Sequence, residues 1–395
     1  MNEQLLYIMA FVIPTVMLPL VLPMVVLMAR RKRMTDNPSR RKLQERPVAV
    51  MGGTVVMLVL SVSLLLINVF YDLGSLFPVL CLMVILFIFG MLDDMIGLTW
   101  QFKLALQVVA VLLLYFGSNY GVHSLFSLFP GMEFHWSVAL PLTLFLGVLL
   151  LNAVNFVDGI DGLATALTML AAYVMGYWNV MHGFTAQALF SFAVGGVLLT
   201  FLVFNIFSVR YKTYLGDSGT LVLGLFLFIA VTPDTMDTMN PDILMDHYYF
   251  SHALALLSAM IFDLVRVVLW RIVNGQSPFR PDRTHLHHVY VDLGMSHLMA
   301  ATTIVLSNVL VLLVWRLTAG WGLSQWQQLL LVFVFCALIY WGPFFHLTYL
   351  RDRRSQRYRR LSLAVRRVNR VFEIFHDRVG RLIDGHRSRI YHEIE

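Results

Sequence analysis

The amino-acid sequence predicts an all-α polytopic membrane protein with about eleven transmembrane helices. Of the 395 residues, 58% are hydrophobic and 13% are charged, whereas soluble domains have roughly 45–50% apolar and about 25% charged residues. Apolar runs close to the ~20 residues that cross a bilayer recur along the chain. The two cysteines, Cys81 and Cys336, lie inside such runs without disulfide or metal-ligand spacing, so they do not indicate a redox compartment.

The predicted spans follow one another at short intervals. They are residues 5–29, 48–70, 77–92, 103–120, 137–154, 163–181, 186–207, 218–232, 248–270, 299–317 and 325–350. The first run is too long for the core of a signal peptide and has no small-residue cleavage site, so we expect it to be retained as a span. The sequence therefore predicts a transmembrane domain over residues 1–350 and a separate tail over residues 351–395.

The basic residues set the orientation of the spans. With the N-terminus outside, all of the 29 lysines and arginines except Arg316 fall in inner segments or at the inner ends of spans. Cytoplasmic segments of membrane proteins carry an excess of Lys and Arg, so we expect a periplasmic N-terminus and a cytoplasmic C-terminus. Because the positive charge follows the membrane topology, the net charge of +6 does not indicate nucleic-acid binding.

The tail combines many arginines with apolar residues at spacings of four and three, the pattern of an amphipathic helix. These apolar residues are Leu361, Val365, Val368, Phe372, Phe375, Val379 and Leu382. Two interpretations are open. The tail is either a basic helix that lies on anionic lipid or a coiled-coil-like contact between the subunits of a homodimer.

Polar groups interrupt the apolar pattern most strongly between residues 152 and 163. Two amides and two carboxylates are found here: Asn152, Asn155, Asp158 and Asp161. Ionisable groups at the edge of a membrane segment are costly and by default indicate function. Asp158 and Asp161 are three residues apart, which on a helical turn places both carboxylates on one face. A divalent metal or a phosphate-bearing substrate suits this pattern; a capping turn between two spans is the alternative.

Three further acids lie at the inner ends of spans. Asp93 and Asp94 end the third span, and adjacent carboxylates repel each other unless a cation or a shared proton lies between them. We therefore expect a Mg²⁺ site here, or one metal ligand beside one base; solvated charges at a helix end are the alternative. Asp217 lies where a later span begins. It either caps that helix or binds metal while the neighbouring glycines let a phosphate approach.

Segment 277–288 is the most polar connection between spans. It contains Arg283 and three histidines, His285, His287 and His288. Three histidines suit zinc, but no thiol accompanies them. Arginine binds phosphate oxygens with paired hydrogen bonds, so pyrophosphate recognition is the favoured interpretation.

Other residues near the inner face carry weaker signals. Arg46 follows a basic run and precedes Gly52 and Gly53 at the start of the second span. The glycine pair either lets helices pack closely or offers its backbone to a lipid phosphate. Lys103 begins the fourth span close in sequence to the Asp-Asp pair, and it either faces phosphate or extends to the lipid headgroups.

All of these motifs fall on the inner face although they are far apart in sequence. We therefore expect one active site at the cytoplasmic boundary of the membrane. Acids for a metal and cationic groups for phosphates at a lipid boundary indicate phosphoryl transfer between a soluble nucleotide compound and a lipid phosphate. An ion-coupled transporter also needs intramembrane acids, but near the bilayer midplane and in repeated halves, and the sequence has neither feature.

The ordered motifs resemble those of the polyprenyl-phosphate N-acetylhexosamine-1-phosphate transferases. They are RPVAVMGG at 46–53, LDD at 92–94, NFVDGIDGL at 155–163, GDSG at 216–219 and SPFRPDRTHLHH at 277–288. Within that family, the His-x-His-His form is typical of the bacterial enzymes that start O-antigen and enterobacterial common antigen synthesis. The peptidoglycan branch instead carries three consecutive histidines.

The resemblance implies transfer of GlcNAc-1-phosphate from UDP-GlcNAc to undecaprenyl phosphate, with release of UMP and a requirement for Mg²⁺ or Mn²⁺. It implies a multi-pass protein of the bacterial inner membrane with its active site on the cytoplasmic face. Residues 1–350 are then the catalytic domain. Another UDP-N-acetyl sugar stays open as the donor.

The resemblance also assigns roles to residues. Asp217 is implied to be the principal metal ligand, with Asp93 and Asp94 beside the metal and the lipid phosphate. Asn155, Asp158 and Asp161 are implied to line the nucleotide and catalytic pocket. The further substrate-binding candidates are Arg46, Gly52, Gly53, Lys103, Asn152, Arg283, His285, His287 and His288.

Overall fold

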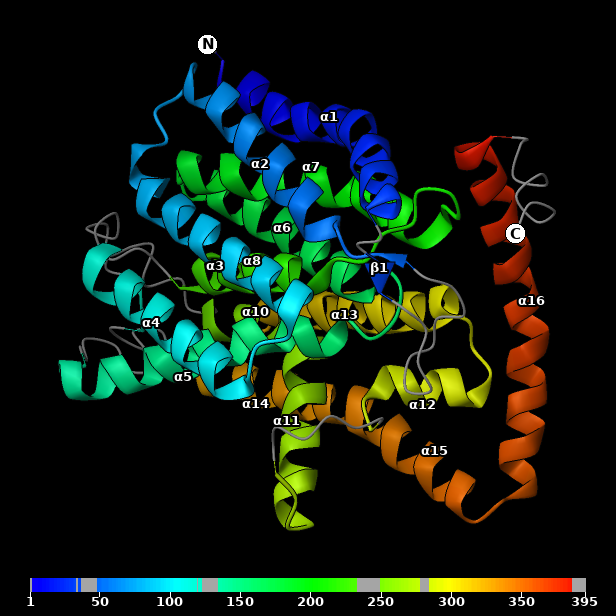
Figure 1. Ribbon diagram of the computed structural model, residues 1–395. Helices are drawn as coiled ribbons and strands as arrows, with labels where there is room; N and C mark the ends of the chain where they lie inside the picture. The colour runs from blue at the N-terminus through cyan, green and yellow to red at the C-terminus, as the bar shows by residue number, and fades with distance from the viewer. Residues whose placement is uncertain are drawn as a thin grey trace. The chain divides into compact units, whose positions relative to one another are not determined.

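The computed structural model describes residues 2–32, 35–36, 48–118, 120–122, 134–232, 249–277 and 284–385 (Figure 1). The chain divides into two compact units. The first unit is Met1–Leu98, Ala164–Leu223 and Arg370–Glu395, and the second unit is Thr99–Leu163 and Gly224–Asn369.

The first unit is built on long apolar helices. Its elements are α1 (Glu3–Arg31), the strands β1 (Thr35–Asp36) and β2 (Val48–Ala49), α2 (Gly52–Asn68), the 3₁₀ turn η1 (Gly74–Leu76), α3 (Phe77–Ile96), α6 (Leu163–Met181), α7 (Thr185–Phe207) and the start of α8 (Gly216–Val231). Helix α1 packs along α7 and α2, and these three lie side by side in Figure 1. β1 and β2 form a short antiparallel ladder.

Helix α1 contains prolines at positions 14, 19 and 23. A proline has no backbone N–H, so it leaves the carbonyl four residues earlier without its helical donor. For Pro19 that carbonyl belongs to Thr15, and the Thr200 hydroxyl of α7 donates to it over 3.0 Å. The neighbouring helix therefore replaces the missing hydrogen bond, which is how prolines are tolerated in membrane helices.

The second unit contains the remaining helices. They are α4 (Trp100–Ser118), α5 (Trp136–Val157), α10 (Tyr249–Leu256), α11 (Ser258–Val273), α12 (Leu286–Leu293), α13 (His297–Ala319), α14 (Gln325–Cys336), the π-helix η2 (Ala337–Trp341), α15 (Gly342–Asp352) and the first half of α16 (Gln356–Asp384). Helix α5 packs against α4 and α11, and α10 packs against α13 and α14.

Helices α10 and α11 meet at a bend of 80°. The bend frees backbone groups, and Asn308 of α13 pairs with them. Its Oδ1 accepts from the Ala259 N–H over 3.0 Å, and its Nδ2 donates to the Leu256 carbonyl over 3.0 Å. Tyr340 of the π-helix completes the cluster, with its hydroxyl 3.0 Å from the Ser258 hydroxyl.

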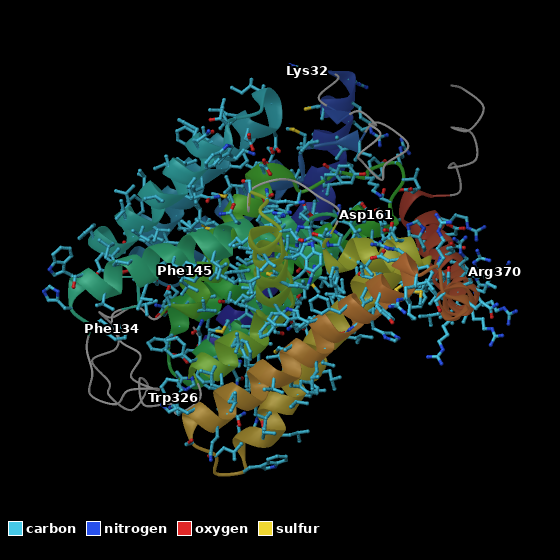
Figure 2. All side chains as sticks on the ribbon, turned by 90° about the horizontal axis from the view of Figure 1, so that it is seen from below. Lys32, Phe134, Phe145, Asp161, Trp326 and Arg370 are labelled. Carbon is cyan, nitrogen blue, oxygen red and sulfur yellow. The ribbon has the colours of Figure 1, made fainter. Side chains whose placement is uncertain are left out.

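Among the described residues, eight helices are long and apolar enough to cross a membrane, or nine if the bent pair is one span. Two shorter apolar helices, α2 and α8, accompany them. Large apolar side chains are exposed on these helices, for example Phe116 and Phe145, the second of which is labelled in Figure 2, as lipid-facing residues are. The chain is thus a polytopic membrane protein, while the count of eleven and the orientation stay predictions.

The predicted spans coincide with helices, with two differences. The run 248–270 is divided by the bend at Leu257, and the run 325–350 contains a π-helical segment. The all-α prediction also omitted the β1–β2 ladder. The bend depends on Asn308, which lies some fifty residues away, and local periodicity carries no information about such a partner.

We predict that Asn308→Leu lowers stability, because it leaves the freed backbone groups at the bend unpaired in an apolar interior. Each unpaired buried group costs about 1–3 kcal/mol. Ser307→Ala is the matched control, since in the part of the chain that the structure describes the Ser307 hydroxyl bonds only within its own helix, to the Thr303 carbonyl. Thermal unfolding of the purified protein should show a lower midpoint for Asn308→Leu alone. Equal midpoints for the two variants would contradict this role.

Candidate active site

In the first unit, Asp94 at the end of α3 caps the N-terminus of α8. Its Oδ1 accepts from the Asp217 N–H over 2.7 Å. Its Oδ2 accepts from the Ser218 N–H over 3.1 Å and from the Ser218 hydroxyl over 2.8 Å. Free N–H groups and the helix dipole favour an anion at this position. The sequence predicts that a phosphate could approach the N-terminus of α8. In the structure, the Asp94 carboxylate binds there instead.

Glycines allow α3 and α8 to approach closely enough for this contact. A Cβ on Gly90 of α3 would lie 2.5 Å from the Ser218 Cα and 2.7 Å from the Asp217 carbonyl oxygen. Gly216 begins α8 with a φ of +72°, which a side chain rarely adopts. The motif GDSG thus allows α8 to pack closely against α3 and also carries Asp217.

The Gly52-Gly53 pair has its backbone N–H groups engaged. They donate to the carbonyls of Tyr214 and Leu215, each over 2.8 Å. A Cβ on Gly53 would overlap the Gly219 nitrogen and the Ser218 Oγ. These contacts favour the helix-packing alternative for the pair, and they join the start of α2 to the segment before α8. Arg46 lies outside the described residues.

Asp93 and Asp94 are adjacent in sequence but have different surroundings. Asp93 is buried, and its Oδ1 accepts from the Leu98 N–H over 2.6 Å, where Gly97 reverses the chain with a φ of +69°. Asp94 is exposed and interacts electrostatically with Asp217. The carboxylates of Asp94 and Asp217 are therefore the neighbouring pair.

The Asp94–Asp217 pair suits a divalent cation. Mg²⁺ prefers oxygen donors and usually binds through one or two carboxylates together with water and substrate phosphates. Within the described residues, no group of three or more His, Cys, Asp or Glu side chains could hold a metal ion by itself. The donor set therefore fits an ion that substrate phosphates complete rather than a closed structural site.

In the second unit, Asp158 and Asp161 lie in the connection between α5 and α6 (Figure 2 labels Asp161). Asp158 is the C-cap of α5, and residues 158–162 form turns rather than a helical turn. Gly162, with a φ of +79°, interrupts the helical path. The prediction that helical geometry places the two carboxylates on one face was therefore wrong.

Asp161 is paired with a histidine that the sequence interpretation missed. The Asp161 Oδ2 lies 2.8 Å from Nδ1 of His297, the first residue of α13. Nothing in the local sequence singles out His297. Only the folded chain brings it to the acid from 136 positions away.

A buried network orders the histidine segment. The Oδ2 of Asp263, in α11, lies 2.8 Å from the Nδ1 of His285. The Oδ1 of Asp263 accepts from the Leu286 N–H over 3.0 Å. Arg266, three residues later, donates to the Asp263 Oδ1 over 2.6 Å and to the Thr284 carbonyl over 2.7 Å. The Arg266 guanidinium also lies over the Phe344 ring at 3.4 Å from its centre.

Asp263 and Arg266 were not among the predicted site residues. The available signal was an acid three residues before an arginine inside an apolar run, which marks an ion pair in a membrane helix. The arginine was interpreted only as part of the inward positive charge. In the structure, the Asp263–Arg266 pair also holds the start of α12 and His285 in place.

His287 is buried against the acidic turn. A Cβ on Gly159 would overlap the His287 Nε2, so the ring lies directly on this glycine. Burial, and next the charge of His288, lower the pKa of His287 well below its ordinary value, so the ring is neutral near pH 7. His285 stacks on Phe156 with ring centres 5.5 Å apart. The Asx-Gly turn and the histidine segment, far apart in sequence, are therefore in contact.

Three other predicted residues have distinct surroundings. The Asn152 amide donates to the Gln107 side chain over 2.7 Å and to the Val148 carbonyl over 2.7 Å, which joins α5 to α4. Asn155 is exposed, and Lys103 is half-buried in the first turn of α4. Of the predicted cationic set, Arg283 lies outside the described residues and His288 is half-buried.

Comparison with known proteins shows what the chain is similar to. Residues 76–233 match the family profile described as Glycosyl transferase family 4. The chain is 28% identical over 293 residues to the undecaprenyl-phosphate alpha-N-acetylglucosaminyl 1-phosphate transferase of Escherichia coli (strain K12), covering 71% of this chain and 76% of that protein. The similarity to glycosyl transferase family 4 therefore includes the segments that carry the acids of the candidate site.

Two further relatives match a similar share of the chain. The probable undecaprenyl-phosphate N-acetylglucosaminyl 1-phosphate transferase of Bacillus subtilis (strain 168) is 26% identical over 298 residues, covering 75% of this chain and 80% of that protein. The undecaprenyl-phosphate alpha-N-acetylglucosaminyl 1-phosphate transferase of Yersinia pestis is 26% identical over 321 residues, covering 78% of this chain and 83% of that protein. The profile match contains all five predicted acids but ends before the histidine segment.

We predict that Gly90→Ala separates α3 from α8 and removes the Asp94 cap. The added methyl group meets backbone atoms, which cannot move aside as a side chain can. Gly117→Ala in α4 is the control, because a Cβ there has no neighbour within 4 Å among the residues that the structure describes. Gly90→Ala should unfold at a lower temperature in a thermal melt, and Gly117→Ala should not. A Gly90→Ala protein as stable as the control would refute the close packing.

We predict that Asp263→Ala is strongly destabilising, because it leaves Arg266 as an uncompensated buried charge. Removing one partner of a buried ion pair costs about 3–5 kcal/mol. The double variant Asp263→Leu/Arg266→Met, which buries no charge, should recover much of that loss in thermal unfolding. If the double variant is less stable than Asp263→Ala, the pair is not the source of the effect.

Proposed function

We propose that the protein transfers GlcNAc-1-phosphate from UDP-GlcNAc to undecaprenyl phosphate, giving undecaprenyl-diphosphate-GlcNAc and UMP. The observation that carries the proposal is the similarity over about three quarters of the chain to relatives whose names state this transfer. The oxygen-rich Asp94–Asp217 pair on a polytopic membrane scaffold supports it. The same chemistry would start a lipid-linked polysaccharide such as O-antigen or enterobacterial common antigen.

In the proposed reaction, a phosphate oxygen of the lipid attacks the β-phosphorus of the UDP-sugar. The bond from that phosphorus to the bridging oxygen breaks, and UMP leaves with the bridging oxygen. A lipid phosphate is already anionic near neutral pH, so we favour direct attack over a covalent aspartyl intermediate. Such transfers depend mainly on positioning and charge neutralisation.

The carboxylates of Asp94 and Asp217 would hold Mg²⁺ or Mn²⁺, which supplies neutralisation of the phosphate charge when bound. Asp94 has a second task, because the same carboxylate orders the first turn of α8 and with it the backbone of Asp217. Asp93, whose oxygen closes the turn after α3, would keep this helix end in place.

Within the second unit, we propose a set of groups that bind nucleotide and phosphate. Asn155, Asp158 and Asp161 belong to a polar segment whose last acid is held by His297. His288, Lys103 and Arg283 are the proposed phosphate-binding groups. Asn152 and His285 would act by positioning, since their polar atoms are bonded within the protein, and His287 by packing its ring on Gly159.

We also propose a bacterial inner-membrane location with eleven spans, a periplasmic N-terminus and the site on the cytoplasmic face. The eleven spans would be the eight long helices, the bent pair α10–α11 as one span, and the two shorter apolar helices α2 and α8. The inward distribution of Lys and Arg supports the orientation. Residues 1–350 would form the catalytic domain and 351–395 the tail.

We predict UMP release by the purified full-length protein with Mg²⁺, undecaprenyl phosphate and UDP-GlcNAc, and no release without lipid or with EDTA. UDP-GalNAc and other UDP-N-acetyl sugars in parallel reactions identify the donor. Release with another sugar alone would replace GlcNAc in the proposal. No release with any donor, from protein with a cooperative thermal transition, would overturn the transfer activity.

We predict that Asp217→Asn lowers kcat by roughly a hundredfold or more, because metal neutralisation contributes several kcal/mol. The backbone N–H that binds Asp94 is kept in this variant, so its thermal midpoint should stay near that of the wild type. Asp72→Asn is the control, since among the described residues the Asp72 carboxylate accepts only from the nearby Gly74 N–H, over 2.8 Å. Near-normal turnover by Asp217→Asn would exclude it as a metal ligand.

A further inference from the structure

Helix α16 is docked on the protein along one face, by polar contacts, by the buried Val365 and by the Phe375 ring, whose inner edge meets the Phe207 ring at 5.7 Å between centres. In the second unit, the Ser362 hydroxyl donates to the Leu293 carbonyl over 2.7 Å, and Asn369 accepts from the Ser296 N–H over 2.7 Å. In the first unit, the Asp384 carboxylate accepts from the Ser208 hydroxyl over 2.6 Å and from the Val209 N–H over 2.7 Å. These contacts are specific, so α16 is a docked helix and not a loose tail.

The docking points lie at the ends of candidate membrane spans. Ser296 is the N-cap of α13, and Ser208 is the C-cap of α7. Both α7 and α13 are long and apolar enough to cross the bilayer. Each half of α16 is therefore anchored, within its own unit, where a span leaves the membrane.

A second face of α16 is apolar and exposed. Val368, Val371 and Phe375 are each more than half exposed, and they repeat at spacings of three and four on one side of the helix. Leu361 and Leu382 extend the same stripe toward its two ends. A row of this length on a water-soluble surface is unfavourable unless something covers it.

The third face carries the charges. Eight arginines of α16 are exposed: Arg357, Arg359, Arg360, Arg366, Arg367, Arg370, Arg378 and Arg381. Figure 2 shows Arg370 among nitrogen-tipped side chains that project from this helix. A cluster of basic residues of this size attracts anionic lipid headgroups.

We propose that α16 is an interfacial helix whose apolar stripe enters the headgroup region of an anionic membrane while its arginines bind lipid phosphates. An amphipathic helix with basic residues beside an apolar face lies in the plane of the interface. Each half of α16 is anchored at the end of a candidate membrane span, which supports a position of the helix at the membrane surface. A second copy of the chain is disfavoured as the partner, because two such arginine arrays repel each other.

The test uses the full-length protein in nanodiscs, with Cys81→Ser and Cys336→Ser as background. An environment-sensitive fluorophore is attached through Val371→Cys on the apolar stripe, or through Asp377→Cys on the polar face as the matched control. Lipids carrying bromine in the upper acyl chain serve as quenchers, in discs of phosphatidylcholine with or without phosphatidylglycerol. A cooperative thermal transition is required of each labelled protein.

We expect quenching at Val371→Cys to exceed that at Asp377→Cys by roughly twofold or more in discs with phosphatidylglycerol, and to fall in phosphatidylcholine alone. Adding Arg366→Gln, Arg367→Gln and Arg370→Gln should remove the dependence on phosphatidylglycerol. Equal quenching at the two positions would overturn the proposal. Disulfide formation between two copies through Val371→Cys, without lipid quenching, would overturn it in favour of a subunit interface. UMP release plays no part in the readout, so the outcome is separate from that of the proposed activity.

Discussion

The structure depends on one constraint: a polar group within an apolar membrane helix must find a partner inside the protein. The Thr200 hydroxyl serves the carbonyl that Pro19 leaves open, and the Asn308 amide serves the backbone at the α10–α11 bend. Asp263 and Arg266 neutralise each other in α11. The first two contacts each fix one helix against another, and the Asp263–Arg266 pair holds the start of α12 through Thr284, His285 and Leu286. Satisfying the constraint therefore also builds the tertiary structure.

The same constraint shapes the candidate site. The Asp94 carboxylate is stabilised by N–H groups at the start of α8, and in the same contact it orders the backbone that carries Asp217. In the second unit, the Asp263–His285 contact holds the start of α12, and His297 holds Asp161. Acids at helix ends are thus pre-positioned by protein donors before any substrate binds, which is the arrangement that phosphoryl transfer requires.

Much of this could be predicted from the sequence because hydropathy and charge are local properties. The helix ranges follow the apolar runs, and the acids and histidines were recognised from residue type alone. The pairings were not predictable: His297 reaches Asp161, and Asp94 reaches Ser218, only through the folded chain. For the same reason the sequence does not decide between a helical turn and a capping turn at 158–162, or between close helix packing and phosphate binding for the Gly52-Gly53 pair.

We propose that the metal is held by the Asp94–Asp217 pair rather than by the Asp158–Asp161 turn. Electron paramagnetic resonance of Mn²⁺ titrated into the purified protein distinguishes the two sites, since bound and free Mn²⁺ have different spectra. We expect Asp217→Asn to lose the bound signal and Asp161→Asn to keep it. Retention of the signal in Asp217→Asn together with its loss in Asp161→Asn would exclude the Asp94–Asp217 pair as the metal site.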